Sequence, residues 1–194
     1  MIALDQLSRV VILGTSCSGK TTFASALADT LKAPHIELDA LHWGPNWTPN
    51  PPDQFRAAVD QATSQLRWVC DGNYRMVRDL VWPRASSIIW LNYRFPLVFK
   101  RASLRTFGRC FRQTRVYAGN QETFFHSFLS RDSIILWVLR SHWGLRREYL
   151  EALHSSKCEH AQIIQLNSAP QAAQFLNAVQ QLASIQSPIR SDPN

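Results

Sequence analysis

Apolar residues gather in short runs that are separated by longer segments of mixed polarity. Five runs are nearly continuous and rich in β-branched residues, which is typical of parallel strands buried on both faces. These runs lie at residues 9–13, 35–38, 68–70, 87–91 and 161–166. In the segments between and after them, apolar positions recur at helical intervals, which predicts helices at residues 20–32, 53–66, 96–115, 121–153 and 170–184. Alternating strands and helices indicate an α/β fold built on a parallel sheet.

The two long helical patterns between the fourth and fifth predicted strands exceed what a single crossover needs. We therefore predict one domain over residues 1–184, with a helical lid or insertion at about residues 94–153 and a loose tail at residues 185–194. The 194 residues are 45% hydrophobic and 18% charged, which excludes a disordered chain.

Cysteine usage and hydropathy favour a cytoplasmic protein. The four cysteines are far apart and form no C-x-x-C pair, which argues against a disulfide framework and against a zinc site. No apolar run approaches the roughly 20 residues of a membrane span, and the N-terminus lacks the pattern of a signal peptide. We expect no membrane partner, and the sequence leaves the oligomeric state open.

Positive charge is concentrated in the predicted insertion. The whole chain has a net charge of +7, while residues 94–149 hold 11 Lys and Arg against 3 Asp and Glu, a net charge of +8. The rest of the chain is therefore slightly acidic. Such a segment favours an anionic partner, which can be the phosphates of a nucleotide, a nucleic acid or, less favoured, a lipid surface.

Residues 14–21, with the sequence GTSCSGKT, fit the phosphate-loop pattern G-x-x-x-x-G-K-[ST] at every position. The glycines permit positive φ angles, so that successive backbone N–H groups can point at phosphate oxygens. Lys20 is expected to reach the β- and γ-phosphates of a nucleotide, and the Thr21 hydroxyl is expected to bind Mg²⁺. The residues predicted to bind the nucleotide are Gly14, Thr15, Ser16, Cys17, Ser18, Gly19, Lys20, Thr21 and Thr22.

The predicted strand at residues 68–70 is followed by Asp71, as a Walker B carboxylate requires. Asp71 is predicted to hold Mg²⁺ together with Thr21. Other predicted strands also end in glycine or polar residues, which are Gly14, Asp39, Asn92 and Asn167. Because ligands of open α/β sheets bind outside the carboxyl ends of the strands, we expect one site at this edge. The chain lacks the N-K-x-D motif of GTPases and the LSGGQ motif of transporter ATPases.

Several segments resemble the adenylate kinases and their relatives. Residues 71–75, DGNYR, are similar to the D-G-F-P-R segment of adenylate kinases, and Arg101 and Arg105 have the R-x-x-x-R spacing that opens the lid of those enzymes. A closer resemblance is to a bacterial group of small P-loop proteins described as adenylate-kinase-like or "topology modulation" proteins. Their pattern is similar to L-D-x-L-x-W-x-P-x-W at residues 38–47, followed by D-G-N-Y at residues 71–74. The resemblance spans most of residues 9–183.

This resemblance implies the nucleoside-monophosphate-kinase-like fold of P-loop NTPases, a five-stranded parallel sheet of order 2-3-1-4-5 flanked by helices. It also implies ATP and Mg²⁺ as cofactors. Several features depart from the adenylate kinases, two of them at the acceptor side. Tyr74 stands where those enzymes have Pro, and an aromatic, Pro-rich loop at residues 41–52 replaces their AMP-binding helix. These departures weigh against AMP as the acceptor, but not against ATP as the phosphoryl donor.

The remaining candidates would bind the acceptor. Asp39 can orient or deprotonate an acceptor hydroxyl, or it can cap the loop that follows it. Trp43 and Trp47 can stack a base or a sugar, or they can pack against the core. Arg75 follows Asp71 closely enough to bind an anionic group of the acceptor.

A stripe of arginines recurs at helical intervals in the predicted helix at residues 96–115. Its members are Arg101, Arg105, Arg109, Arg112 and Arg115. Because phosphoryl transfer needs donors that stabilise negative charge, Arg101 and Arg105 are predicted to act in catalysis with Lys20, Asp39 and Asp71. The same stripe can instead be a solvated helix face, or a surface that binds a nucleic-acid backbone.

Together these motifs predict an ATP-dependent phosphotransferase of the nucleotide-kinase type. It would move the γ-phosphoryl group of ATP to a small acceptor that the sequence does not identify. The alternative is a nucleic-acid-binding P-loop NTPase of the topology modulation type, whose arginine helix would contact DNA or RNA. A nucleotide sensor that binds ATP without turnover is a third and less favoured reading.

Overall fold

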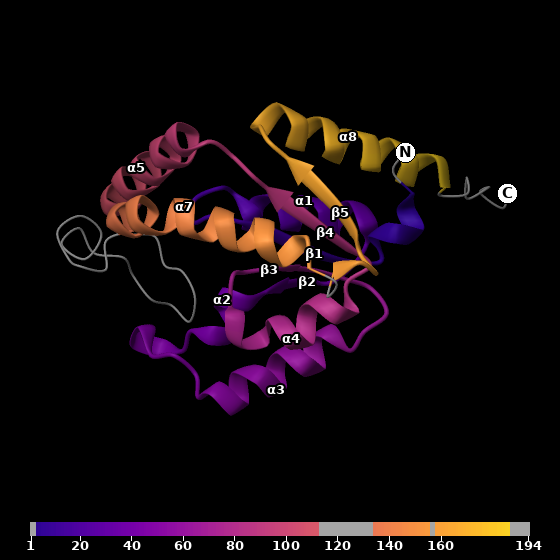
Figure 1. Cartoon of the computed structure of the whole chain (residues 1–194), viewed down its shortest axis with the longest axis horizontal. Helices are drawn as coiled ribbons and strands as arrows, with labels where there is room; N and C mark the ends of the chain where they lie inside the picture. Colours follow the sequence, from indigo (N-terminus) through magenta and orange to yellow (C-terminus); the bar gives the residue numbers. More distant parts are fainter. Residues whose placement is uncertain (1–2, 113–133, 156–157, 187–194) are drawn as a thin grey trace, which may run out of the picture.

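The strands of the protein form one five-stranded parallel sheet with helices on both faces (Figure 1). This computed structural model describes residues 3–112, 134–155 and 158–186, without the side chains of residues 105–112, 134–137 and 186. The strands are β1 (Arg9–Gly14), β2 (His35–Glu37), β3 (Trp68–Asp71), β4 (Ser87–Leu91) and β5 (Gln162–Leu166). Their order is β2-β3-β1-β4-β5, which confirms the predicted fold class and strand order.

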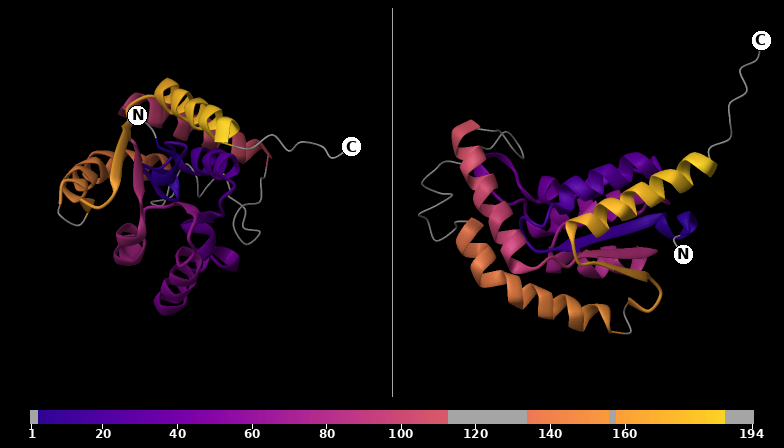
Figure 2. Two further views of the ribbon diagram at one scale, coloured as in Figure 1. Left: turned by 90° about the vertical axis from the view of Figure 1, so that its right-hand side faces the viewer. Right: turned by 90° about the horizontal axis from the view of Figure 1, so that it is seen from above.

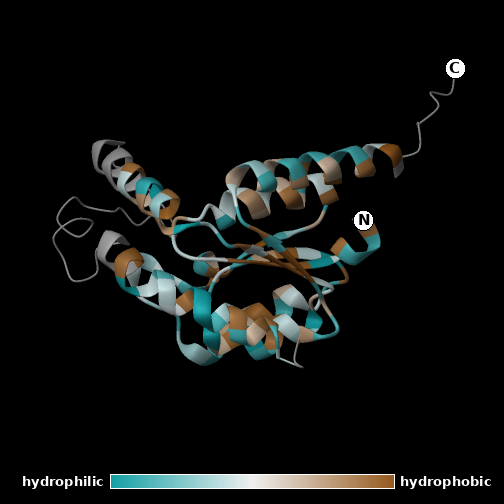
Figure 3. Cartoon of the chain, turned by 45° about the horizontal axis from the view of Figure 1, so that its top comes forward, coloured by the Kyte–Doolittle hydropathy of each residue, from teal (hydrophilic) through white to brown (hydrophobic). Residues whose placement is uncertain are grey.

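Strand β1 lies at the centre of the sheet, and its side chains alternate between two apolar layers. Val10 and Ile12 pack on the side of α1 (Lys20–Leu31) and α8 (Ala169–Gln186). Val11 and Leu13 pack on the opposite side, which is covered by α3 (Pro52–Thr63), α4 (Arg78–Val81) and the end of α7 (Ile134–Leu153). Figure 2 shows the two helical layers from the side, and Figure 3 shows the apolar strands enclosed between them. Burial on both faces explains why the strand sequences are nearly continuous apolar runs.

Among the described residues, two helices come between β4 and β5 in the chain, α5 (Phe95–Arg112) and α7. They pack against each other where Phe95 stacks on Trp143, with 4.7 Å between the ring centroids. The predicted helix at residues 96–115 thus begins one residue earlier, and its last three residues lie outside the described part of the chain. The same holds for residues 121–133 of the predicted second helix and for most of the predicted tail. Among the described residues, no helix has the length and apolar character needed to cross a membrane.

The chain turns into a helix where the sequence pattern predicts that the second strand continues. β2 ends at Glu37, and residues 38–42 form the short helix α2 (Leu38–His42). Asp39 therefore lies in the first turn of α2 and not at the end of a strand, which corrects the prediction. Leu38, the first residue of α2, packs against Gly72, where an added Cβ atom would lie 2.6 Å from the Leu38 Cβ.

Other short elements complete the fold. Helix α3 begins at Pro52, one residue before the predicted start, and ends at Thr63 instead of at residue 66. Two hydrogen bonds satisfy carbonyl groups at the end of α3. The Thr63 hydroxyl donates to the Val59 carbonyl, and the Ser64 N–H donates to the Gln61 carbonyl. The remaining elements are the 3₁₀ helices η1 (Leu4–Leu7), η2 (Pro45–Trp47), η3 (Arg75–Val77) and η4 (Trp82–Arg84).

Candidate functional site

The phosphate-loop motif connects the buried strand β1 to helix α1. The backbone has positive φ at Cys17 (62°) and at Gly19 (91°). Gly14 does not need positive φ but needs space, because a Cβ atom there would lie 2.5 Å from Ser18 Oγ and 3.2 Å from the Leu91 carbonyl oxygen. The prediction that both glycines serve positive φ is thus correct for Gly19 and wrong for Gly14. Both glycines therefore allow a tight loop before the start of α1. The first turn of α1 offers backbone N–H groups to an anion.

Lys20 is the first residue of α1, so its side chain starts at the mouth of the loop. Its ammonium donates to the Thr15 carbonyl oxygen at 3.2 Å, across the loop. An ammonium in this position can turn from the carbonyl to a bound phosphate without any backbone movement.

Thr21 and Asp71 meet beside the loop. The Thr21 hydroxyl donates to Asp71 Oδ2 at 2.8 Å, and the Asp71 side chain is only 4% exposed. Asp71 reaches this place because it ends β3 and is paired in register with Ile12 of β1, two residues before the loop begins. A hydroxyl and a carboxylate oxygen side by side fit Mg²⁺, which takes one or two protein oxygens and completes its shell with phosphates and water. No cluster of three or more His, Cys, Asp or Glu side chains suited to a metal occurs among the described residues, so a site made of protein ligands alone is absent there.

His35 is a partner of Asp71 that the sequence analysis missed. Its Nε2 lies 2.9 Å from Asp71 Oδ1, on the opposite side of the carboxylate from Thr21. Burial lowers the pKa of His35, but the hydrogen bond to Asp71 and the charges of Asp71 and Glu37 outweigh it, so the pKa is raised. The signal that could have found His35 is the register of β2 against β3, which pairs Glu37 with Asp71 and brings His35 to the diagonal position.

Arg101 is the member of the arginine stripe whose described side chain reaches the phosphate loop. Its Nη1 donates to the Ser18 carbonyl oxygen at 2.6 Å, and its guanidinium lies 5.2 Å from the centroid of the Tyr93 ring. Arg105, Arg109 and Arg112 belong to α5, but their side chains lie outside the described residues, as does the whole of Arg115.

The candidates on the acceptor side lie in an aromatic cluster around Asp39 and Tyr74. Tyr74 donates its hydroxyl hydrogen to Asp39 Oδ1 at 2.6 Å. Trp43 and Trp47 contact each other edge to face, with 5.7 Å between centroids, and His42 lies between Trp43 and Tyr74. The structure therefore brings Asp39 close to the aromatic residues, as one site at this edge requires.

Arg75 is paired with a carboxylate from the insertion. Glu148 of α7 accepts hydrogen bonds from Arg75 Nε at 2.8 Å and from Arg78 Nη2 at 2.7 Å. Burial raises the pKa of Glu148, but the two guanidinium groups outweigh it and hold the pKa below its usual value. Arg75 is predicted to bind an anionic group of the acceptor, and in the structure its partner is Glu148, an anion of the chain itself.

Comparison with known proteins adds the fold class. No protein-family model matches the chain, and no curated protein sequence matches it. Among solved structures, a shikimate kinase from Bacteroides thetaiotaomicron has a TM-score of 0.52 at 15% sequence identity, covering 91% of this chain and 98% of that chain. A protein from Chloroflexus aurantiacus has a TM-score of 0.51 at 12% identity, with the same coverage of both chains. A gluconokinase from Sinorhizobium meliloti has a TM-score of 0.47 at 18% identity, covering 93% and 98%.

The first two likenesses show that the chain has a P-loop kinase-like fold, in agreement with its phosphate loop and strand order. At these identities they establish the fold alone. The resemblance to the topology modulation proteins stays a prediction, because no family model matches.

Proposed function

We propose that the protein is an ATP-dependent phosphotransferase that moves the γ-phosphoryl group of ATP to a small hydroxyl-bearing acceptor. The observation that carries this proposal is the 2.8 Å hydrogen bond between Thr21 Oγ1 and Asp71 Oδ2. It brings the hydroxyl that follows the phosphate-loop lysine next to the carboxylate that ends β3, which is the pairing that P-loop enzymes use for Mg²⁺. The fold that the chain shares with a shikimate kinase supports the proposal.

The nucleotide side of the proposed site consists of residues 14–22 and their neighbours. Backbone N–H groups of the loop and of the first turn of α1 bind the phosphates, and Lys20 leaves the Thr15 carbonyl to bind the β- and γ-phosphates. Thr21 and Asp71 hold Mg²⁺, which neutralises charge on these phosphates when it is bound. Arg101, already at the loop, donates to the phosphoryl group that is transferred.

The acceptor side consists of Asp39, Trp43, Trp47 and Arg75. Tyr74 fixes the Asp39 carboxylate through a 2.6 Å hydrogen bond, so that its second oxygen can accept the proton of an acceptor hydroxyl. The two tryptophans offer apolar surface for the carbon skeleton of the acceptor. Arg75 holds this side together through Glu148.

The proposal is tested with ATP that is labelled in its γ-phosphoryl group. The protein is incubated with Mg²⁺ and a panel of nucleosides, nucleoside monophosphates and small hydroxylated metabolites. We expect the label in one organic product, formed in proportion to ADP. Release of labelled inorganic phosphate alone, stimulated by DNA or RNA, would contradict the proposal and favour the nucleic-acid-binding alternative.

Arg101→Ala is expected to lower phosphoryl transfer about a hundredfold, because a preorganised donor to the transferred group is lost. Lys100→Ala is the matched control, since Lys100 is the neighbouring cation of the same helix and is exposed. Turnover should be nearly unchanged in the control. If the helix instead binds nucleic acid, both substitutions should weaken duplex-DNA binding to a similar extent, and turnover should stay the same.

His35→Ala is expected to raise the Mg²⁺ concentration needed for half-maximal turnover about tenfold, because Asp71 loses the group that orients it. His35→Gln should recover most of the effect, since the glutamine amide can still donate to Asp71 Oδ1. His154→Ala serves as the control, because His154 is exposed and its ring Nδ1 contacts the Leu150 carbonyl of its own helix. An unchanged Mg²⁺ dependence in His35→Ala would mean that this histidine only fills space.

A further inference from the structure

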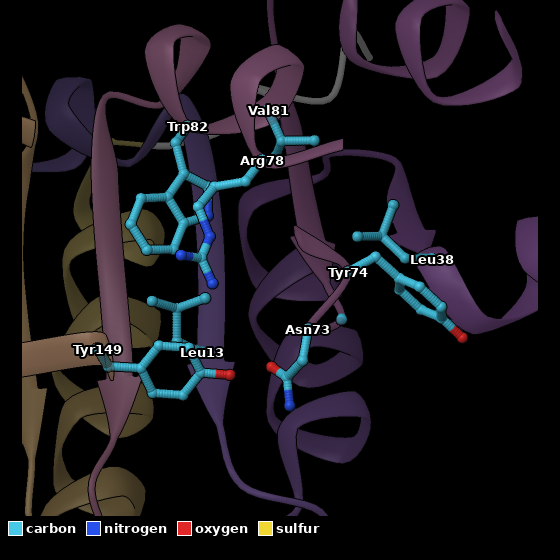
Figure 4. A pocket seen from close by; sticks show the side chains of 9 residues that line it. Leu13, Leu38, Asn73, Tyr74, Arg78, Val81, Trp82 and Tyr149 are labelled. Carbon is cyan, nitrogen blue, oxygen red and sulfur yellow. The ribbon is translucent and has the colours of Figure 1, made fainter. Parts of the chain in front are cut away.

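Several buried polar atoms have no hydrogen-bond partner in the described part of the chain, and two of them are Asn73 Oδ1 and Tyr149 Oη. Both side chains line the same pocket, which lies between residues 72–74 after β3, helix α4 and helix α7 (Figure 4). Buried polar atoms are nearly always paired with protein or with ordered water. Two unpaired atoms in one pocket therefore indicate that something else binds between them.

The orientation of the Asn73 amide is fixed by the phosphate loop. Its Nδ2 donates to the Gly14 carbonyl oxygen at 2.7 Å, so the nitrogen must face the loop. The opposite atom, Oδ1, then faces the pocket, as Figure 4 shows. This oxygen can only accept a hydrogen bond.

Tyr149 faces Asn73 from the other wall of the pocket (Figure 4). The residue is 1% exposed, and its ring packs edge-on against Trp90 with 6.0 Å between the centroids. Burial raises the pKa of the Tyr149 hydroxyl even though the charge of Arg78 opposes it. The phenol therefore keeps its proton and can donate a hydrogen bond.

A hydroxyl group is the natural occupant of the space between these two atoms. It can donate to Asn73 Oδ1 and accept from the Tyr149 O–H at the same time. The pocket is small and has room for about one water-sized group. Its lining includes neither Asp71 nor any residue from 15 to 22, so a hydroxyl held here is not the one that is phosphorylated. The ligand needs a second hydroxyl for that.

The chain already supplies an anion beside the pocket. Arg78 is the one charged side chain among the described residues that line it. Its guanidinium lies 4.5 Å from the centroid of the Trp82 ring and donates to Glu148, which is 19% exposed and also pairs with Arg75. A phosphate or carboxylate of a ligand would compete with Glu148 for these guanidinium groups. An uncharged ligand meets no such competition.

We infer that Asn73 and Tyr149 form a subsite for one hydroxyl group of the acceptor, and that the acceptor is an uncharged compound with at least two hydroxyl groups. Sugars, polyols and ribonucleosides share this chemistry. The inference rests on the proposed phosphotransferase function and narrows its acceptor class.

The first test compares uncharged compounds with anionic ones. Phosphoryl transfer and calorimetric binding are measured in the presence of Mg²⁺ and ATP or its non-hydrolysable analogue. The uncharged set is glucose, myo-inositol, glycerol and adenosine, and the anionic set is gluconate and AMP. At least one uncharged compound should bind and be phosphorylated, and the one preferred tells whether a sugar, a polyol or a nucleoside is the source of the hydroxyl groups. Preference of the wild-type protein for an anionic compound overturns the inference.

The second test removes one oxygen atom. Tyr149→Phe should raise KM for the acceptor about threefold to tenfold, the effect of one lost hydrogen bond. KM for ATP should not change, and the midpoint of thermal unfolding should stay the same or rise, since an unpaired buried hydroxyl is gone. If the midpoint behaves in this way but KM for the acceptor is unchanged, the pocket holds only water and the inference is wrong.

The third test changes the charge balance. Glu148→Gln frees Arg75 and Arg78, so the anionic compounds should bind about fivefold more tightly than to the wild type, while uncharged acceptors keep their affinity. Glu151→Gln is the control, an exposed glutamate on the same helix. Equal affinity of the anionic compounds for both variants counts against the inference. If the wild type binds MgATP but phosphorylates only anionic compounds, the acceptor class is wrong and the kinase proposal stands; if it does not bind ATP, both fail.

Discussion

Turnover of ATP is expected to fall by about a hundredfold to a thousandfold when Lys20 is replaced by Ala, because the cation that stabilises the transferred phosphoryl group is lost. The fold should persist, since Lys20 is the first residue of α1 and does not belong to the apolar core. Alanine is also a favourable residue in a helix. The midpoint of thermal unfolding should therefore stay close to that of the wild type.

The measurement combines steady-state turnover with calorimetric titration of ATP. Lys32→Ala is the matched control, because Lys32 is exposed and lies at the opposite end of the same helix. It removes the same charge from the chain and should leave turnover and ATP affinity as they are. Unchanged turnover in Lys20→Ala would show that the loop does not bind phosphates in the assigned way.

The second large effect is expected at the carboxylate beside the loop. Asp71→Asn keeps the shape of the side chain but removes the charge that holds Mg²⁺, so turnover at saturating ATP should fall about a hundredfold. The Thr21 hydroxyl can still donate to the amide oxygen, and the site therefore keeps its local geometry. Binding of ATP without Mg²⁺ should change little.

The Mg²⁺ dependence of turnover separates this loss from a folding defect. Asp79→Asn makes the same chemical change at an exposed carboxylate that is paired with Arg56 on the surface, where ion pairs contribute little. This control should behave like the wild type. Full activity of Asp71→Asn at high Mg²⁺ would show that Asp71 ends β3 but does not hold Mg²⁺.

The parts of the site that are local in sequence could be predicted from the sequence. The phosphate loop is a contiguous motif, and Asp71 follows an apolar run that can only be a strand. Both signals depend on neighbouring residues, and the buried central position of β1 makes the strand pattern unusually clear. The arginine stripe was predicted from helical spacing, but which arginine reaches the loop depends on where α5 begins after β4.

The residues that were missed depend on contacts between distant segments. His35 reaches Asp71 only through the register of β2 against β3, and Glu148 reaches Arg75 across 73 positions of the chain. Neither register nor helix packing is written in a local pattern. Asp39 differs from the prediction for another reason: Leu38 extends the apolar run of the strand, yet it is the first residue of helix α2.

The segment after β3 spans the distance between the two halves of the proposed site. Asp71 holds the hydroxyl of Thr21, just behind the phosphate loop, and Asn73, two residues later, holds the carbonyl of Gly14 at its start. Between them Gly72 has a φ of 142°, and it is pressed so closely against Leu38 that no larger side chain fits. Residues 71–73 are thus hydrogen-bonded to both ends of the loop. Nucleotide and acceptor thus share one backbone support. If binding of one ligand shifts this support, the affinity for the other ligand changes by some factor, and the second ligand changes the affinity for the first by the same factor.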